Sequence, residues 1–196
     1  MLSDPQQWNE AAETLGLEIT CRTRWLRRPS RLIGSFDGFP VDIDYDVSGY
    51  SQLTTIHLFL PPGPWDESMF MVFAPPDPWH STVRARMPDA YPTTGDTEFD
   101  SRLAVSARGG QANSAQRFLT ARRRKALLAL HREIPEFRFG ARPRNDDLLL
   151  PTSLSSQFKV NGWRWQRRRS GRMPGTQIVD RVRAMAATGQ ELVDSL

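Results

Sequence analysis

The chain has 196 residues, of which 39% are hydrophobic, and its formal net charge at pH 7 is +4. This length and apolar content predict one folded domain over residues 1–196 and exclude a disordered chain. No apolar run approaches the roughly 18 residues of a membrane-spanning helix, and the first residues lack the pattern of a signal peptide. Cys21 is the one cysteine, so no internal disulfide forms. We therefore expect a cytoplasmic protein without a membrane partner.

The charge is unevenly distributed along the chain. Residues 1–100 hold 7 arginines against 15 acidic residues, a net charge of −8. Residues 101–175 hold 15 arginines and two lysines against four acidic residues, a net charge of +13. An acidic first half and a basic second half either neutralise each other within the fold or create a dipolar surface.

The first half of the sequence contains clear periodic patterns. Apolar residues recur at helical spacing from Trp8 to Leu15, and Gly16 favours the end of that helix. Side chains then alternate between apolar and polar from Leu17 to Trp25, which predicts a strand.

Asp37-Gly38 is a strong signal for the two-residue turn of a β-hairpin. The register that this turn fixes places Arg31 opposite Asp44 as a favourable cross-strand charge pair. Asp44 belongs to the run VDIDYD, whose alternate carboxylates are typical of a solvated strand face. We therefore do not expect that run to bind a metal ion.

The second half predicts a central helix flanked by strands. Alternating side chains from Phe99 to Val105 favour a strand. Thr120 is suited to be the N-cap of a helix over about residues 121–134, and a strand returns at Phe137.

Asn161-Gly162 predicts a second hairpin, which we expect to form a basic insertion over residues 156–172. A last helix is predicted from a cap at Thr176 to a stop at Gly189. Together these elements predict an α+β fold: a mainly antiparallel sheet of about seven or eight strands, with an N-terminal, a central and a C-terminal helix.

Residues 94–107, TGDTEFDSRLAVSA, precede a helix of the form RFLTxxxRKALLAL and a strand. This arrangement resembles a segment of many uncharacterised bacterial proteins, in which a Gly-Asp-x-x-Phe-Asp turn and strand come before a helix ending in Leu-Leu-x-Leu. The distinctive positions are Gly95, Asp96, Phe99 and Asp100. The likeness covers roughly residues 30–155. It implies no particular activity, cofactor or partner.

No catalytic motif stands out. His57, His80 and His131 are scattered, and a single cysteine does not make a zinc site. Asp96 and Asp100 suggest a pair of carboxylates for acid–base catalysis, but both also fit structural roles in a turn and a strand. We therefore expect no catalytic residue, no metal site and no cofactor.

Two basic clusters are the strongest functional candidates. Arg122, Arg123, Arg124 and Lys125 fall in the first turn of the central helix, where cations oppose the helix dipole and free N–H groups favour an anion. Acidic groups of the chain itself, phosphates or an acidic partner could supply that anion. The second cluster comprises Lys159, Arg164, Arg167, Arg168, Arg169 and Arg172 of the predicted hairpin.

We consider three hypotheses of function, the first two of which rest on these clusters. The first is a non-enzymatic interaction domain that binds an acidic protein partner, or another copy of itself, through its basic second half. The second is a nucleic-acid-binding module that uses both clusters. The third, which we favour least, is an enzyme centred on Asp96 and Asp100.

Overall fold

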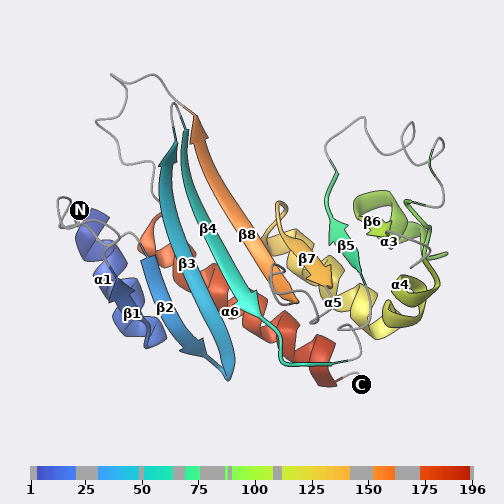
Figure 1. Ribbon diagram of the computed structural model, residues 1–196, viewed down its shortest axis with the longest axis horizontal. Coiled ribbons are helices and arrows are strands. Elements are labelled where there is room, and N and C mark those ends of the chain that lie inside the picture. Colours follow the sequence, from blue (N-terminus) through green and yellow to red (C-terminus); the bar gives the residue numbers. More distant parts are fainter. Residues whose placement is uncertain are drawn as a thin grey trace. The chain divides into compact units, whose positions relative to one another are not determined.

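A computed structural model describes residues 4–20, 31–48, 51–63, 69–75, 87, 90–107, 112–141, 152–161 and 173–194. The chain packs into two compact units (Figure 1). The first unit comprises Met1–Leu58 and Ser155–Ala186, and the second comprises Phe59–Leu154 and Ala187–Leu196. The prediction of one domain over residues 1–196 with an insertion at residues 156–172 stays a prediction, because residues 162–172 lie outside the described ranges.

The first unit contains five strands and two helices among its described residues. They are α1 (Asp4–Leu15), β1 (Glu18–Thr20), β2 (Arg31–Phe36), β3 (Phe39–Ser48), β4 (Ser51–Phe59), β8 (Ser153–Asn161) and α6 (Gly175–Asp194). The strands follow the order β1-β2-β3-β4-β8, and the pairs β1–β2, β2–β3 and β3–β4 are antiparallel. The ends of β4, β8 and α6 continue into residues of the second unit.

The hairpin of β2 and β3 has the predicted register, with Arg31 opposite Asp44. Asp37 and Gly38 both have positive φ angles, 50° and 82°, as a two-residue hairpin turn requires. The Arg31 guanidinium donates to the Asp42 carboxylate at 2.7 and 2.6 Å. The charge of Asp44, its predicted cross-strand partner, also raises the pKa of Arg31. Asp42 is the diagonal neighbour, which a long side chain reaches across a twisted sheet.

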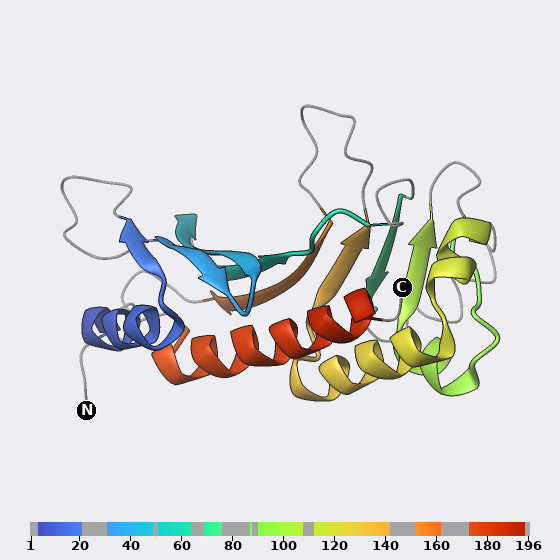
Figure 2. The same ribbon diagram turned by 90° about the horizontal axis from the view of Figure 1, so that it is seen from below.

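Helices α1 and α6 lie on the same side of strands β2 to β4 (Figure 2). Their apolar residues and one face of the strands form the core of this unit: Trp8, Ala11, Ala12, Leu15, Leu32, Val41, Ile43, Ile56, Leu58, Ile178, Val182 and Met185. The Trp8 indole N–H donates to the Met173 carbonyl at 3.2 Å. At the start of α6 the backbones nearly touch, because a Cβ added at Gly175 would lie 2.2 Å from the Gln7 carbonyl oxygen.

The second unit contains the remaining described strands and helices. They are β5 (Phe70–Phe73), α3 (Thr97–Arg102), β6 (Ala104–Ala107), α4 (Ala112–Phe118), α5 (Ala121–Glu133) and β7 (Arg138–Ala141). Strand β5 lies between β7 and β6 and is antiparallel to both. The rings of Phe70, Phe118 and Phe139 pack with centroids 5.2 to 5.8 Å apart, and α5 buries Leu127 and Leu130.

The predicted strand from Phe99 to Val105 is wrong over most of its length. Residues Thr97–Arg102 form helix α3, and only Ala104–Ala107 form a strand. The error has a simple cause, because Phe99 and Leu103 are both buried and a separation of four residues suits a helix as well as a strand. The Asp96 side chain accepts the Phe99 N–H as an N-cap, which selects the helix.

The α+β fold class is confirmed, with eight described strands and the N-terminal, central and C-terminal helices in place. Thr120 caps α5 as predicted. The last helix is longer than predicted, since Gly189 lies buried inside it and α6 continues to Asp194. Leu192 is fully buried, and this packing offsets the cost of a glycine within the helix.

Candidate functional site

The first basic cluster lies on the N-terminal turn of α5, and two of its arginines contact the last turn of α6. Arg122 donates through Nε to the Glu191 carboxylate at 2.8 Å, and this contact raises the pKa of Arg122. Arg123 donates through Nε to the Leu192 carbonyl at 3.3 Å and through Nη1 to the Phe118 carbonyl at 3.0 Å. All these residues belong to the second unit.

Arg123 is a buried cation. Its side chain is only 4% exposed, and its guanidinium carbon lies 4.4 Å from the centroid of the Phe118 ring. Burial lowers the pKa of Arg123, although an arginine stays protonated at neutral pH. The two carbonyls and the aromatic face compensate for the lost hydration, so Arg123 serves the fold and is not accessible to a ligand.

Arg124 faces a third group of partners. It donates through Nε to the Asp96 carboxylate at 3.0 Å and through Nη1 to the Leu119 carbonyl at 2.6 Å. Asp96 also accepts the Phe99 N–H at 3.1 Å, and this bond together with Arg124 holds the pKa of Asp96 below its usual value. Asp96 belongs to the acidic first half of the sequence, so this ion pair is a contact of the kind predicted between the two halves.

The junction of α5 with α6 explains the unusual position of these charges. The first turn of α5 contains no acidic residue and the last turn of α6 no basic one, so both helix ends carry side-chain charges of the wrong sign for the helix dipole. The cationic end of α5 meets the carbonyl end of α6 and Glu191. Each unfavourable end therefore stabilises the other.

The exposed face of α5 carries the cations that remain accessible. Arg122, Lys125 and Arg132 lie within about 80° of one another around the helix axis, on an exposed face that they share with Glu133. Arg132 donates to Glu98 of α3 at 3.0 Å. Arg122 and Arg132 are 55% and 61% exposed. Within the described part of the chain, no ion pair or hydrogen bond involves the Lys125 side chain.

Most of the second cluster lies outside the residues that the structure describes. Lys159 lies in β8 of the first unit, and its side chain is outside the described set. Arg164, Arg167, Arg168, Arg169 and Arg172 all lie outside the described residues. The part of this cluster in any binding surface stays a prediction.

Asp96 and Asp100 have the geometry of structural residues. The two oxygens of Asp100 accept the backbone N–H groups of Thr94 and Gly95 and the Thr94 hydroxyl, at 3.0 to 3.1 Å. Both oxygens of Asp96 are also engaged, by Phe99 and Arg124. Asp100 thus closes the loop before α3, while Asp96 caps that helix and binds it to α5. A lowered pKa makes Asp96 a poor general acid at neutral pH.

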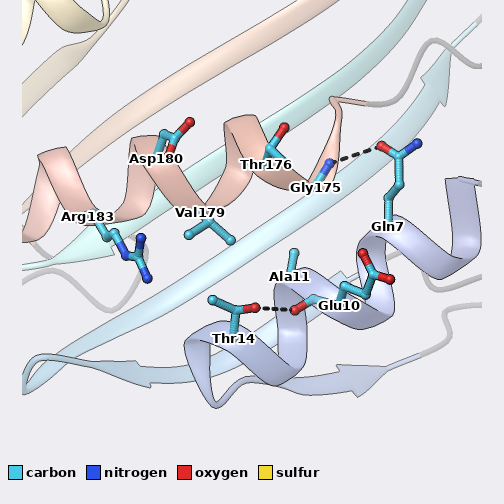
Figure 3. Close-up of a pocket in the computed structure, with 9 residues that line it drawn as sticks. All are labelled: Gln7, Glu10, Ala11, Thr14, Gly175, Thr176, Val179, Asp180 and Arg183. Carbon is cyan, nitrogen blue, oxygen red and sulfur yellow. Dashed lines mark hydrogen bonds between the residues drawn. The ribbon is translucent and has the colours of Figure 1, made fainter. Parts of the chain in front are cut away.

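A groove of about 510 Å³ lies between α1 and the first half of α6 in the first unit (Figure 3). It is lined by Gln7, Glu10, Ala11, Thr14, Gly175, Thr176, Val179, Asp180 and Arg183. The Gln7 side chain accepts the Gly175 N–H at 3.4 Å, so the first amide of α6 already has a partner. The lining mixes both charge signs and hydroxyls with apolar surface, and this chemistry selects no single ligand class.

Sequence reasoning missed Glu191 and Leu192 as partners of the first cluster, and Glu98 as the partner of Arg132. Glu191 and Leu192 were missed because the last helix was expected to end at Gly189. A signal was present, since the segment after Gly189 contains Glu191 and Asp194 and no cation. Acidic residues at a helix C-terminus need a cationic neighbour, just as the arginines of α5 need an acidic one.

No protein-family model, curated protein or solved structure matches this chain. The resemblance to bacterial proteins with the Gly-Asp-x-x-Phe-Asp motif therefore stays a prediction. No helix in the described ranges is both long and apolar enough to cross a membrane. Among those same residues, no group of three or more His, Cys, Asp and Glu side chains is placed to hold a metal ion.

Proposed function

We propose that the chain is a non-enzymatic cytoplasmic interaction domain that binds an acidic protein partner, or another copy of itself, through the exposed basic face of α5. The observation that carries this proposal is the row of Arg122, Lys125 and Arg132 on one face of a helix whose other face is buried. Cations held on a rigid helix offer a fixed pattern of charge to a partner.

The contacts within the second unit favour a carboxylate-bearing partner. Arg122 binds Glu191 and Arg132 binds Glu98, each through one guanidinium group and one carboxylate. Both pairs are more than half exposed, so they contribute little stability and exchange readily for similar contacts from another protein. An acidic helix or loop would reproduce this chemistry on the same face.

The test measures binding of fluorescent poly-L-glutamate at 50 mM salt. The variant Lys125→Glu plus Arg132→Glu is expected to lose about tenfold in affinity or more, because two attractive contacts become repulsive. The matched control is Arg117→Glu plus Arg183→Glu, which changes the net charge equally at exposed positions on α4 and α6. The control should bind within about twofold of the wild type if only the α5 face matters.

Equal losses in the two variants would contradict the proposal, because binding would then depend on net charge alone. A second arm replaces poly-L-glutamate with duplex DNA at 50 and 200 mM salt. Tight binding to DNA with a steep salt dependence, and none to poly-L-glutamate, would replace this proposal with the nucleic-acid hypothesis.

A further inference from the structure

The last turn of α6 occupies part of the surface that the proposed function assigns to a partner. Glu191 binds Arg122 at the N-terminal end of the α5 face, and both side chains are about half exposed. Asp194 also acts on Arg122, since its charge contributes to the raised pKa of that arginine. The chain thus supplies its own carboxylate to the first cation of the row.

The contact between α5 and the last turn of α6 has a weak, exposed part and a strong, buried part, so the weak part can break while the strong part holds. The exposed Arg122–Glu191 pair is easily exchanged with water or with another carboxylate. The neighbouring contact of Arg123 with the Leu192 carbonyl is buried and keeps the helix end nearby. Leu192 itself is fully buried, so the turn is anchored on one side and held by an exposed ion pair on the other.

Local electrostatics favours an exchange of partners at this point. Glu191 and Asp194 lie at the C-terminus of α6, where the helix dipole disfavours negative charge. The cations of α5 offset this unfavourable interaction. The α5 end has the opposite requirement, which any carboxylate meets equally well. An acidic ligand can therefore replace Glu191 on Arg122, and its net gain is reduced by the contact that it displaces.

We propose that Glu191, at the end of α6, is an intramolecular competitor that partly masks the basic face of α5 and lowers its affinity for an acidic partner. The inference rests on the proposed function, because it concerns the same face. Binding of an acidic ligand then releases the Glu191 side chain and loosens the last turn of α6, while Leu192 keeps the helix in place.

The experiment compares wild type with Glu191→Gln for binding of poly-L-glutamate at 50 mM salt. We expect Glu191→Gln to bind about two- to fivefold more tightly, the size expected when one exposed competing ion pair is lost. The control is Glu13→Gln, which removes one exposed negative charge from α1 in the first unit. It should leave the affinity unchanged.

Hydrogen exchange of the amides at residues 191–194 gives a second readout in the wild type. Saturating poly-L-glutamate should speed their exchange if the ligand displaces Glu191. The inference requires both results. Binding that is unchanged in Glu191→Gln, or matched by Glu13→Gln, overturns it and leaves the proposed function intact. Hydrogen exchange at residues 191–194 that is unchanged or slower on binding also overturns the inference and leaves the proposed function intact. If neither wild type nor Glu191→Gln binds the probe, both proposals fall.

Discussion

The two units use charged side chains in different ways. In the first unit the ion pair of Arg31 with Asp42 lies on a strand face, partly exposed, and the core beneath is apolar. In the second unit Arg123 is buried, and it joins segments 69 residues apart in the sequence. The Arg31–Asp42 ion pair therefore lies at the surface of the first unit, whereas Arg123 is part of the core of the second. Removing the exposed Arg31 should be tolerated, whereas removing the buried Arg123 should be damaging.

The largest effect should come from Arg123. Replacing it with alanine leaves the carbonyls of Phe118 and Leu192 without its N–H donors and creates a cavity beside the Phe118 ring. We expect the free energy of unfolding of the second unit to fall by about 2–4 kcal/mol. Urea titration monitored by circular dichroism measures it. Arg123→Met, which restores the side-chain volume but no donor, should recover part of the lost stability. A loss below about 1 kcal/mol for Arg123→Ala would show that burial of this cation is unimportant.

In the first unit, close packing should contribute more to the free energy of unfolding than charge does. Gly175→Ala places a methyl group 2.2 Å from the Gln7 carbonyl oxygen, so α1 and α6 must move apart. A loss of about 1–3 kcal/mol is expected from such overpacking. Gly140→Ala is the matched control, because a Cβ there meets nothing within 4 Å. Equal thermal midpoints for the two variants would contradict the close approach of these helices.

A smaller, pH-dependent effect is expected at Asp96. Its pKa is lowered in the fold by the Phe99 N–H and by Arg124, so the unfolded chain binds the proton more readily. The stabilisation is therefore fully present above the unfolded pKa, near 4, and is lost as the pH falls through the lower folded pKa. Asp96→Asn should be less stable than wild type at pH 7, and the difference should shrink below about pH 4. A difference independent of pH from 3 to 7, in thermal unfolding, would exclude this linkage.

Arg31→Ala should have the smallest effect of the series, below about 1 kcal/mol, because the Arg31 side chain is 40% exposed. Its pKa is raised mainly by the hydrogen bond to Asp42, and that interaction is screened by solvent and salt. Unfolding measured at 50 and 500 mM salt should show the effect disappear at the higher concentration. A loss as large as that of Arg123→Ala would remove the contrast between the units.

The difference between the units also explains which features could be predicted. The register of the hairpin follows from Asp37-Gly38, because a two-residue turn allows one pairing of the strands. The cap at Thr120 and the apolar face of α5 follow from local spacing in the same way. Local rules failed at Phe99, where a separation of four residues fits both helix and strand, and at Gly189, where burial of Leu192 extends the helix.

The candidate site could be predicted only in part. The position of Arg122–Lys125 at the start of α5 was predictable, and so was the need for an anion there. The identity of that anion was not, because Glu191 is 69 residues away and its approach depends on the tertiary fold. The burial of Arg123 between two carbonyls and a ring has no local signature in the sequence.

A charge swap at the junction of α5 with α6 tests the central claim, that two helix ends of unfavourable charge stabilise each other. Arg122→Glu and Glu191→Arg should each speed hydrogen exchange of the amides at residues 191–194, because each single reversal creates a repulsive pair. The double variant Arg122→Glu plus Glu191→Arg restores an attractive pair and also corrects the sign at both helix ends. Protection in the double variant equal to or above that of wild type is the result we predict. Exchange in the double variant as fast as in the faster single variant would contradict the account.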